Sequence, residues 1–466
     1  MQNNTGSRRL RREGTTGGTA MEALLASIKF DITPTHPVSL LGYFNDRVST
    51  GVADPLFCRL LSIENNGARI LIVQIDNCLL PTEYAEELRK EISLHTPYRA
   101  SEILLCTTHT HTAPALIGFY GAKREDSYRK ELYNGIIDRV KAIKPDTPCS
   151  VKITRFRAEG LSHNRRWYMS DGRVVTNPPK GSNKRVKPEG TVDEEVVLIG
   201  FFNKKDNPLA LLVNISNHTD SVGGTEISAD WPGSMERYIE NSLGFPVNTV
   251  TLIAPQGNIN HYNFDSLQDQ TSHEEAERIG KTYGDYVLSY LSQCRATDSG
   301  KLDSVLTYVD IAPREISNAE LKRAREIMQN PESADDSGDL KAGDLETPAV
   351  LRIFATQLLS FHSAMPPLYS VPLQVLQMGN IYLCCIPGEP FVEIGLELKK
   401  SVERGTVVPV SLAGGYFGYI PLETCFDHGG YEIKQGIHNC LSRKAAGIIL
   451  ENFKKILAGL TGREAV

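Results

Sequence analysis

The chain has 466 residues, of which 41% are hydrophobic and 23% charged, a composition typical of a folded globular protein. Its formal net charge of −6 argues against a nucleic-acid partner, because no basic surplus is available to neutralise phosphates. No run of ~18 apolar residues is present, so the sequence predicts no transmembrane segment.

The N-terminal segment carries no export signal that we recognise. The arginine-rich stretch 8–12 is not followed by an adequate apolar segment, because the apolar run that starts at Met21 is short and contains Glu22. We therefore expect a disordered tail over residues 1–22, one large domain over 23–466 and a cytoplasmic location. The sequence also contains nine scattered cysteines and no C-x-x-C pair. This pattern suits reduced, buried thiols better than disulfides, which agrees with the expected cytoplasmic location.

Apolar runs along the chain predict buried strands, and segments with apolar residues three to four apart predict amphipathic helices. Strands are expected at 27–31, 56–63, 69–75, 103–106, 209–215, 250–253 and 381–386. Helices are expected after Thr82, over 132–143, 232–243 and 274–291, after Ser317 and Thr347, and over 449–456. The segment 178–190, rich in Pro, Gly and basic residues, is expected to be a solvated loop.

The apolar run 103–106 is followed by a polar stretch that contains His109 and His111. In an extended backbone residues two apart point the same way, so the two imidazoles are expected on one side. Two histidines at the end of a buried strand indicate metal binding or proton transfer. The alternative is that both are polar side chains that merely complete hydrogen bonds at a strand end.

Other predicted strands also end in polar residues, with Asp76, His218 and Glu389 at or near those ends. Ligand sites in open sheets gather at strand ends and the loops that follow them. If these ends share one rim, two or three histidines and a glutamate converge, and two histidines with a carboxylate form a catalytic zinc set. The simpler alternatives are a capped strand end for His218 and a carboxylate at a helix start for Glu389.

Short motifs occur in a fixed order along roughly residues 28 to 460. They are LGY at 41–43, GVADPL at 51–56, THTHTAP at 108–114, NR at 164–165, SADWPG at 228–233, PGEPF at 387–391, and a segment from GYIP at 418–421 to GYE at 430–432. In this order the motifs resemble those of the neutral/alkaline, non-lysosomal ceramidases, whose signature includes T-H-T-H-S-G-P.

The resemblance implies a zinc amidase that cleaves the N-acyl bond of ceramide. It also implies an α/β fold, a single large domain with two packed mixed β-sheets flanked by helices and the metal at strand ends. By position in the motifs, the implied zinc ligands are His109, His218, Glu389 and Tyr419, the implied catalytic residues are His111, Arg165 and Tyr431, and Gly42 is the implied substrate-binding residue. Tyr416 remains the alternative to Tyr419.

Two departures from the family bear on the substrate, since no export signal and no C-terminal immunoglobulin-like domain is read in this sequence. We therefore keep two alternatives to a ceramide-like substrate: a zinc hydrolase of a small soluble amide, ester or lactone, and a non-catalytic metal- or ligand-binding module. The expected partner is a small-molecule or lipid-like substrate. The acidic segment 332–344 is interpreted as solvated surface, and an effect on the shape of the pocket entrance is the alternative.

Overall fold

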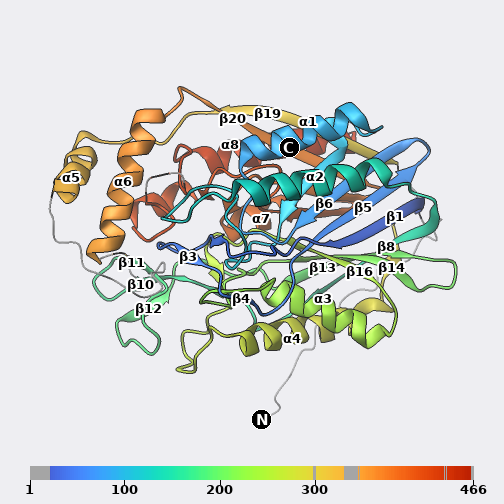
Figure 1. Ribbon diagram of the computed structural model, residues 1–466, viewed down its shortest axis with the longest axis horizontal. Coiled ribbons are helices and arrows are strands. Elements are labelled where there is room, and N and C mark those ends of the chain that lie inside the picture. The colour runs from blue at the N-terminus through green and yellow to red at the C-terminus, as the bar shows by residue number, and fades with distance from the viewer. Residues whose placement is uncertain are drawn as a thin grey trace, which may run out of the picture.

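Two β-sheets packed face to face form the centre of the molecule, with helices over both outer faces (Figure 1). The structure is a computed structural model that describes residues 21–297, 301–329, 345, 347–434, 436 and 438–462. This arrangement confirms the predicted α/β fold with two mixed sheets.

The larger sheet has nine strands in the order β16-β14-β13-β8-β1-β5-β6-β7, with β18 paired to β8. Most neighbours are antiparallel, but β6–β7 and β14–β16 are parallel pairs. The strands are β1 (Met21–Asp31), β5 (Phe57–Asn65), β6 (Ala68–Ile75), β7 (Ile103–Thr107), β8 (Thr147–Arg157), β13 (Glu195–Phe202), β14 (Pro208–Ile215), β16 (Asn248–Ile253) and β18 (Arg295–Ala296).

The smaller sheet has the order β19-β20-β21-β23, and its β21–β23 pair is parallel. Its strands are β19 (Leu302–Ile311), β20 (Tyr369–Met378), β21 (Ile381–Cys385) and β23 (Thr406–Val410). The core between the sheets is built from aliphatic side chains of both, such as Ile72 and Leu104 on one side and Leu383 and Val408 on the other. Strands buried on both faces explain why the apolar runs are continuous rather than alternating.

Eight helices among the described residues complete the layers. Helices α1 (Thr82–His95) and α2 (Asp126–Ala142) cover one half of the outer face of the larger sheet, and α3 (Asp230–Leu243) and α4 (His273–Leu291) cover the other. Helices α7 (Val392–Lys399) and α8 (Ala445–Thr461) cover the smaller sheet. Helices α5 (Asn318–Gln329) and α6 (Pro348–Ala364) stand together at one end (Figure 1). No helix in the described ranges is long and apolar enough to cross a membrane.

The predicted solvated loop 178–190 is partly wrong, because it contains β12 (Arg185–Pro188). This strand pairs with β10 (Arg166–Met169), which also pairs with β11 (Val174–Thr176). An exposed strand of this kind has no apolar face, so periodicity did not reveal it. Of the predicted tail, residues 1–20 lie outside the described residues, and Met21 and Glu22 belong to β1; the segment 332–344 also lies outside the described residues.

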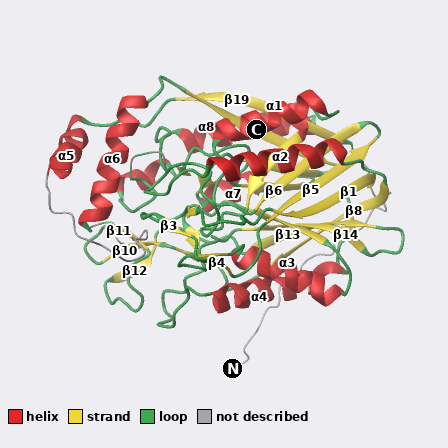
Figure 2. Cartoon of the chain, in the orientation of Figure 1, coloured by secondary structure: helices red, strands yellow, loops and turns green. Residues whose placement is uncertain are grey.

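The larger sheet curls so that its two edges approach each other. The Gln74 side chain on β6 donates from Nε2 to the Thr251 carbonyl on β16 at 2.8 Å. The segment after β23 joins both edges, because Ser411 N donates to the Ile253 carbonyl and Gly414 N to the Leu105 carbonyl, each at 2.7 Å. The loops that follow the strands therefore gather at one end of the sheets (Figure 2).

Short segments in these loops form further pairs. They are β2 (Ser39–Leu40), β3 (Arg47–Val48), β4 (Gly51–Val52), β9 (His163–Asn164), β15 (Glu226–Ile227), β17 (Ile259–Asn260), β22 (Glu389–Pro390) and β24 (Tyr419–Ile420), with 3₁₀ turns η1 (Ala100–Glu102) and η2 (Glu423–Asp427).

Candidate metal centre and active site

Three side chains from separate parts of the chain converge at the gathered strand ends. His109 Nε2 lies 3.1 Å from His218 Nε2 and 3.2 Å from Glu389 Oε2. All three residues are buried, and their ligand atoms lie within 4.8 Å of one another. The sequence-based expectation that these strand ends share one rim is confirmed.

Each of the three residues follows a strand. His109 comes after β7, His218 after β14, and Glu389 lies in β22, just after β21. The two histidines approach because the larger sheet curls, and Glu389 joins them because the smaller sheet packs on the larger one.

The prediction that an extended strand places His109 and His111 on one side is wrong in detail. Strand β7 ends at Thr107, and His109 has a left-handed backbone with φ of 67°. Positive φ is strained for a residue with a side chain and is concentrated at functional sites. The two imidazoles still face each other, with Nε2 atoms 3.3 Å apart, but a turn brings them together rather than strand alternation.

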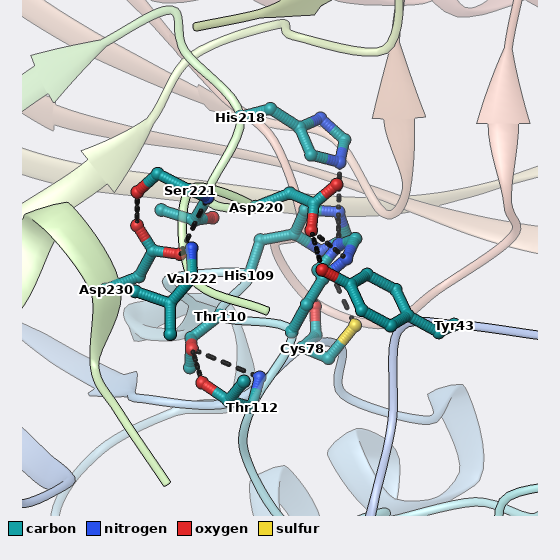
Figure 3. A network of polar contacts seen from close by, with 12 residues as sticks. Tyr43, Cys78, His109, Thr110, Thr112, His218, Asp220, Ser221, Val222 and Asp230 are labelled. Carbon is teal, nitrogen blue, oxygen red and sulfur yellow. Dashed lines mark hydrogen bonds and ion pairs between the residues drawn. The ribbon is translucent and has the colours of Figure 1, made fainter. Parts of the chain in front are cut away.

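The orientation of His109 directs its Nε2 atom toward the other donors. Its Nδ1 atom lies 2.6 Å from the Cys78 carbonyl oxygen, which can only accept, so we assign the proton to Nδ1. The Nε2 lone pair then faces His218 and Glu389. Figure 3 shows His109 between His218 and Cys78. A backbone carbonyl that fixes the tautomer of a histidine in this way is typical of metal-binding histidines.

The protonation states of Glu389 and His218 also suit a metal ion. Burial would raise the pKa of Glu389, but His109 and Arg165 lower it to about 2. Burial, reinforced by Arg165, holds the pKa of His218 well below its usual range. Glu389 is therefore a carboxylate and His218 a neutral imidazole near neutral pH, the forms in which both bind metals.

The two donor separations around His109 Nε2 match those of a tetrahedral metal site. Zinc–nitrogen and zinc–carboxylate distances of ~2.0–2.2 Å place neighbouring ligands of a tetrahedron roughly 3.3 Å apart. The separations of 3.1 and 3.2 Å around His109 Nε2 are close to this value. In the described part of the chain, Glu389 Oε2 and His218 Nδ1 are buried without a hydrogen-bond partner. The residues thus fit a metal ion.

His111 and Gly42 lie directly beside the donors. The His111 Nδ1 atom is 3.3 Å from Asp220 Oδ1, opposite the side that faces His109. Gly42 has φ of +126°, and a Cβ atom there would lie 2.6 Å from His111 Cβ. Any larger residue at position 42 would displace His111. Contact of Gly42 with a substrate stays a prediction.

A buried ion-pair network places Arg165 and Tyr431 at the same site. Arg165 donates from Nε to Glu432 Oε1 and from Nη2 to the Gly257 carbonyl, both at 2.8 Å. Its guanidinium lies 5.4 Å from the Tyr419 ring centroid. The Tyr431 ring centroid is 5.4 Å from that of Tyr419. The four residues form one wall beside Glu389.

Both candidate tyrosines reach Glu389. The Tyr416 hydroxyl donates to Glu389 Oε1 at 2.8 Å. Tyr419 is the parallel cross-strand partner of Glu389 in the β22–β24 pair, so the two side chains leave their strands on the same side. The assignment of Tyr419 rather than Tyr416 as a metal ligand stays a prediction.

Two contacts were not singled out from the sequence. Asp220 lies in the polar stretch that follows β14, and its proximity to His111 depends on how two loops meet. The Cys78 carbonyl is a backbone group, so no side-chain pattern reports it.

Cys78, His109 and His111 form a group that overlaps the candidate metal centre, and a separate group of metal-binding residue types consists of Glu189, Cys425 and His428. Its charges are already satisfied, because Arg166 donates to Glu189 and His428 Nδ1 lies 2.7 Å from Glu189 Oε1. We interpret this group as the outer end of the ion-pair network that includes Glu432.

Comparison with known proteins agrees with the fold and the motifs. No protein-family model matches the sequence. The chain is 27% identical over 234 residues to neutral ceramidase B of Dictyostelium discoideum, covering 47% of this chain and 31% of that protein. It is 25% identical over 234 residues to a neutral ceramidase of Oryza sativa subsp. japonica, covering 47% and 29% of the two chains. The matched segments therefore span less than a third of these relatives.

Solved structures extend the likeness to nearly the whole chain. The crystal structure of neutral ceramidase from Pseudomonas aeruginosa superposes with a TM-score of 0.71 and 16% identity, covering 96% of this chain and 76% of that one. A ceramidase complexed with C2 gives a TM-score of 0.70 at 15% identity. Fold and site define a two-sheet α/β protein with a candidate metal centre at its strand ends. The chain is similar in sequence to neutral ceramidases over 47% of its length and shares the fold of a solved neutral ceramidase.

Proposed function

We propose that this chain is a zinc-dependent hydrolase that cleaves an N-acyl amide bond of a ceramide-like substrate. The observation that carries the proposal is the convergence of His109, His218 and Glu389 at 3.1 and 3.2 Å around one imidazole nitrogen. The names of the curated relatives and the order of the shared motifs support the choice of an amide substrate.

In this proposal His109, His218 and Glu389 hold the ion, with Tyr419 as the fourth protein ligand. A bound zinc ion supplies an activated water near neutral pH and polarises the amide carbonyl. Two imidazoles and a carboxylate are a ligand set found in catalytic zinc sites that keep a position for water or substrate.

The residues of the chain have separate tasks in the reaction. His111 accepts a proton at Nε2 from the attacking water and delivers it to the amide nitrogen as the carbon–nitrogen bond breaks. Arg165 and Tyr431 donate hydrogen bonds to the oxygen that becomes negatively charged in the tetrahedral intermediate. Arg165 is held for this task by Glu432 and by the Gly257 carbonyl.

An aromatic cluster beside the centre favours a compact substrate as the second candidate. Phe354 on α6 packs edge-on to Phe44 at 5.4 Å, and Phe44 packs on Tyr120 at 4.7 Å and on Tyr431 at 5.7 Å. The Tyr120 hydroxyl lies 3.1 Å from that of Tyr431. Tyr120 also lines a cavity of about 640 Å³ between residues 118–122 and α6. A long acyl chain would have to displace these rings to reach that cavity.

The experiment is turnover of a fluorogenic N-acyl sphingoid lipid beside short-chain amides, esters and lactones. Each is measured with the protein as purified, after removal of metal by a chelator, and after Zn²⁺ is restored. The proposal expects amide cleavage that disappears with the metal and returns with zinc. Cleavage confined to esters or lactones would favour the second candidate, and full activity in the metal-free protein would contradict both.

A further inference from the structure

His111 lies between the metal donors and a carboxylate. Its Nε2 atom faces His109 Nε2 at 3.3 Å, and its Nδ1 atom faces Asp220 Oδ1 at 3.3 Å. The His111 ring is perpendicular to both neighbouring imidazoles, with interplanar angles of 84° to His109 and 79° to His218. One side of the ring thus belongs to the reaction centre and the other to Asp220.

Asp220 is itself held in place. The Tyr43 hydroxyl donates to Asp220 Oδ1 at 2.9 Å, and the Tyr43 ring lies 3.9 Å from the Arg47 guanidinium carbon (Figure 3 shows Tyr43 and Asp220 together). The side chain of Asp220 is 17% exposed, so water does not freely replace its contacts. Gly42 packs directly against His111, because a Cβ atom there would lie 2.6 Å from His111 Cβ and 2.9 Å from its Nδ1 atom.

This geometry decides which ring nitrogen of His111 carries the proton. An ionised carboxylate can only accept hydrogen bonds, so Asp220 favours the tautomer with the proton on Nδ1. The lone pair is then on Nε2, directed at the centre. We propose that Asp220 is a positioning residue that keeps His111 in this tautomer and orientation.

The inference rests on the proposed hydrolytic function and makes the role of His111 more specific. With a lone pair on Nε2, His111 begins the reaction as a proton acceptor rather than as a donor to the oxyanion. The proton moves from the attacking water to Nε2 and then passes to the leaving nitrogen, while Asp220 holds the orientation of the ring. The arrangement uses the same logic as the aspartate of a serine-hydrolase triad, with water in place of serine.

The test is Asp220→Asn, studied in the zinc-loaded protein. The amide of asparagine can donate to Nδ1, which favours the tautomer with the proton on Nε2. We expect kcat to fall by ~10²–10⁴ with KM and zinc content little changed. Asp171→Asn, at an exposed aspartate that pairs with Arg173 in the β10–β11 turn, is the control and should leave kcat unchanged. Asp220→Glu keeps the carboxylate and should retain more activity than Asp220→Asn.

A second readout does not require activity. In protein labelled with ¹⁵N-histidine, the nitrogen shifts of His111, assigned by their loss in His111→Ala, report which ring nitrogen is protonated. We expect the proton on Nδ1 in the wild type and in Asp220→Glu, and on Nε2 in Asp220→Asn.

A wild-type proton on Nε2 would overturn the inference, as would an Asp220→Asn variant with unchanged shifts and unchanged kcat. If the wild type hydrolyses none of the substrates, the proposed function fails, and the nitrogen shifts still decide the placement of the proton. If Asp220→Asn does not fold, a wild-type proton on Nδ1 still supports the inference and a wild-type proton on Nε2 overturns it.

Discussion

The Nε2 atoms of His109 and His218 lie 3.1 Å apart, although the residues are separated by 109 positions and follow different strands of the larger sheet. Two imidazole nitrogens at this distance from each other, beside a carboxylate, are the arrangement expected of ligands that share one metal ion. We therefore expect about one zinc per chain after gentle purification. Removal of the ion should lower the melting temperature, since bound metal stabilises the folded state.

Variants of the donors test the same prediction. His218→Ala and Glu389→Gln should each lose the metal, whereas His95→Asn, at an exposed histidine on α1, should retain it. Elemental analysis measures the content. A wild-type protein without any transition metal, or a Glu389→Gln variant with full metal content, would contradict the proposed ligand set.

His111→Ala should retain the metal, and its kcat should fall ~10²–10⁴-fold, which is the range of general acid–base contributions. The physical reason is that His111 Nε2 lies 3.3 Å from His109 Nε2, while its Nδ1 atom lies 3.3 Å from Asp220 Oδ1 rather than at the metal donors. Metal content and kcat are measured on the same preparation. If the variant loses its metal, His111 is a ligand, and the roles assigned to the His109–His111 pair must change.

The two tyrosines beside Glu389 should differ in their effect on metal binding. Tyr416→Phe removes the hydrogen bond to Glu389 Oε1 and should weaken metal binding by ~10–100-fold, as is typical when an outer-shell partner is lost. Tyr419→Phe should weaken it more, because Tyr419 is the predicted ligand. Competition with a chelator of known affinity gives both values. The reverse order would make Tyr416 the ligand.

Phe354→Ala should relax the preference for short acyl chains. The ring of Phe354 packs against Phe44 and Tyr431, and its removal opens a path along the aromatic cluster. Each additional buried methylene is worth ~0.8 kcal/mol, so kcat/KM of the variant should rise with chain length where that of the wild type does not. The substrates are N-acyl amides whose acyl chains run from about two to about sixteen carbons, so that the gain per methylene can be followed from short to long chains.

A matched control for this experiment is Phe361→Ala, also on α6. Phe361 packs in the core between the smaller sheet and α8, so its truncation should lower stability without changing the preference for chain length. A wild-type kcat/KM that already rises through the longest chains would favour the ceramide-like substrate over the compact second candidate.

Glu236 should make the stability of the protein depend on pH. Burial raises the pKa of Glu236 from 4.5 to about 7, although Arg59 opposes the shift. The folded state therefore binds a proton more tightly than the unfolded state. The stabilisation from this proton is complete below about pH 4.5 and is lost as the pH rises to about 7, by up to roughly 3 kcal/mol.

The measurement is the free energy of unfolding by urea between these pH values. Glu236→Gln should lack this loss, so its advantage over the wild type should grow with pH. Glu240→Gln, at a more exposed position on the same helix, should follow the wild type. Parallel curves for the wild type and Glu236→Gln would show that Glu236 ionises normally.

Much of the fold could be predicted because local patterns determine it. The apolar runs that became β6, β7, β14 and β21 are buried on both faces, and such runs are hard to mistake. Helix ends were also marked locally, as by Thr347 and Pro348 at the start of α6. Strand β12 was missed because its residues are mostly exposed and carry no periodic signal.

The candidate site could be predicted in its residue types but not in its contacts. His109, His218 and Glu389 were recognisable from strand ends and motifs. The approach of Asp220 to His111 depends on the curl of the larger sheet, which arises from strand twist summed over many residues. The left-handed backbone of His109 is likewise imposed by its surroundings, since histidine alone does not prefer it.

The donors come from both sides of the packed sheets, with His109 and His218 after strands of the larger sheet and Glu389 after a strand of the smaller one. During synthesis the two histidines leave the ribosome long before the glutamate, so a partly made chain offers only two of the three donors. Tight uptake of an ion would then occur only after the second sheet has docked on the first. The ion would cross-link the two sheets, and its binding would be one of the last steps of folding rather than one of the first.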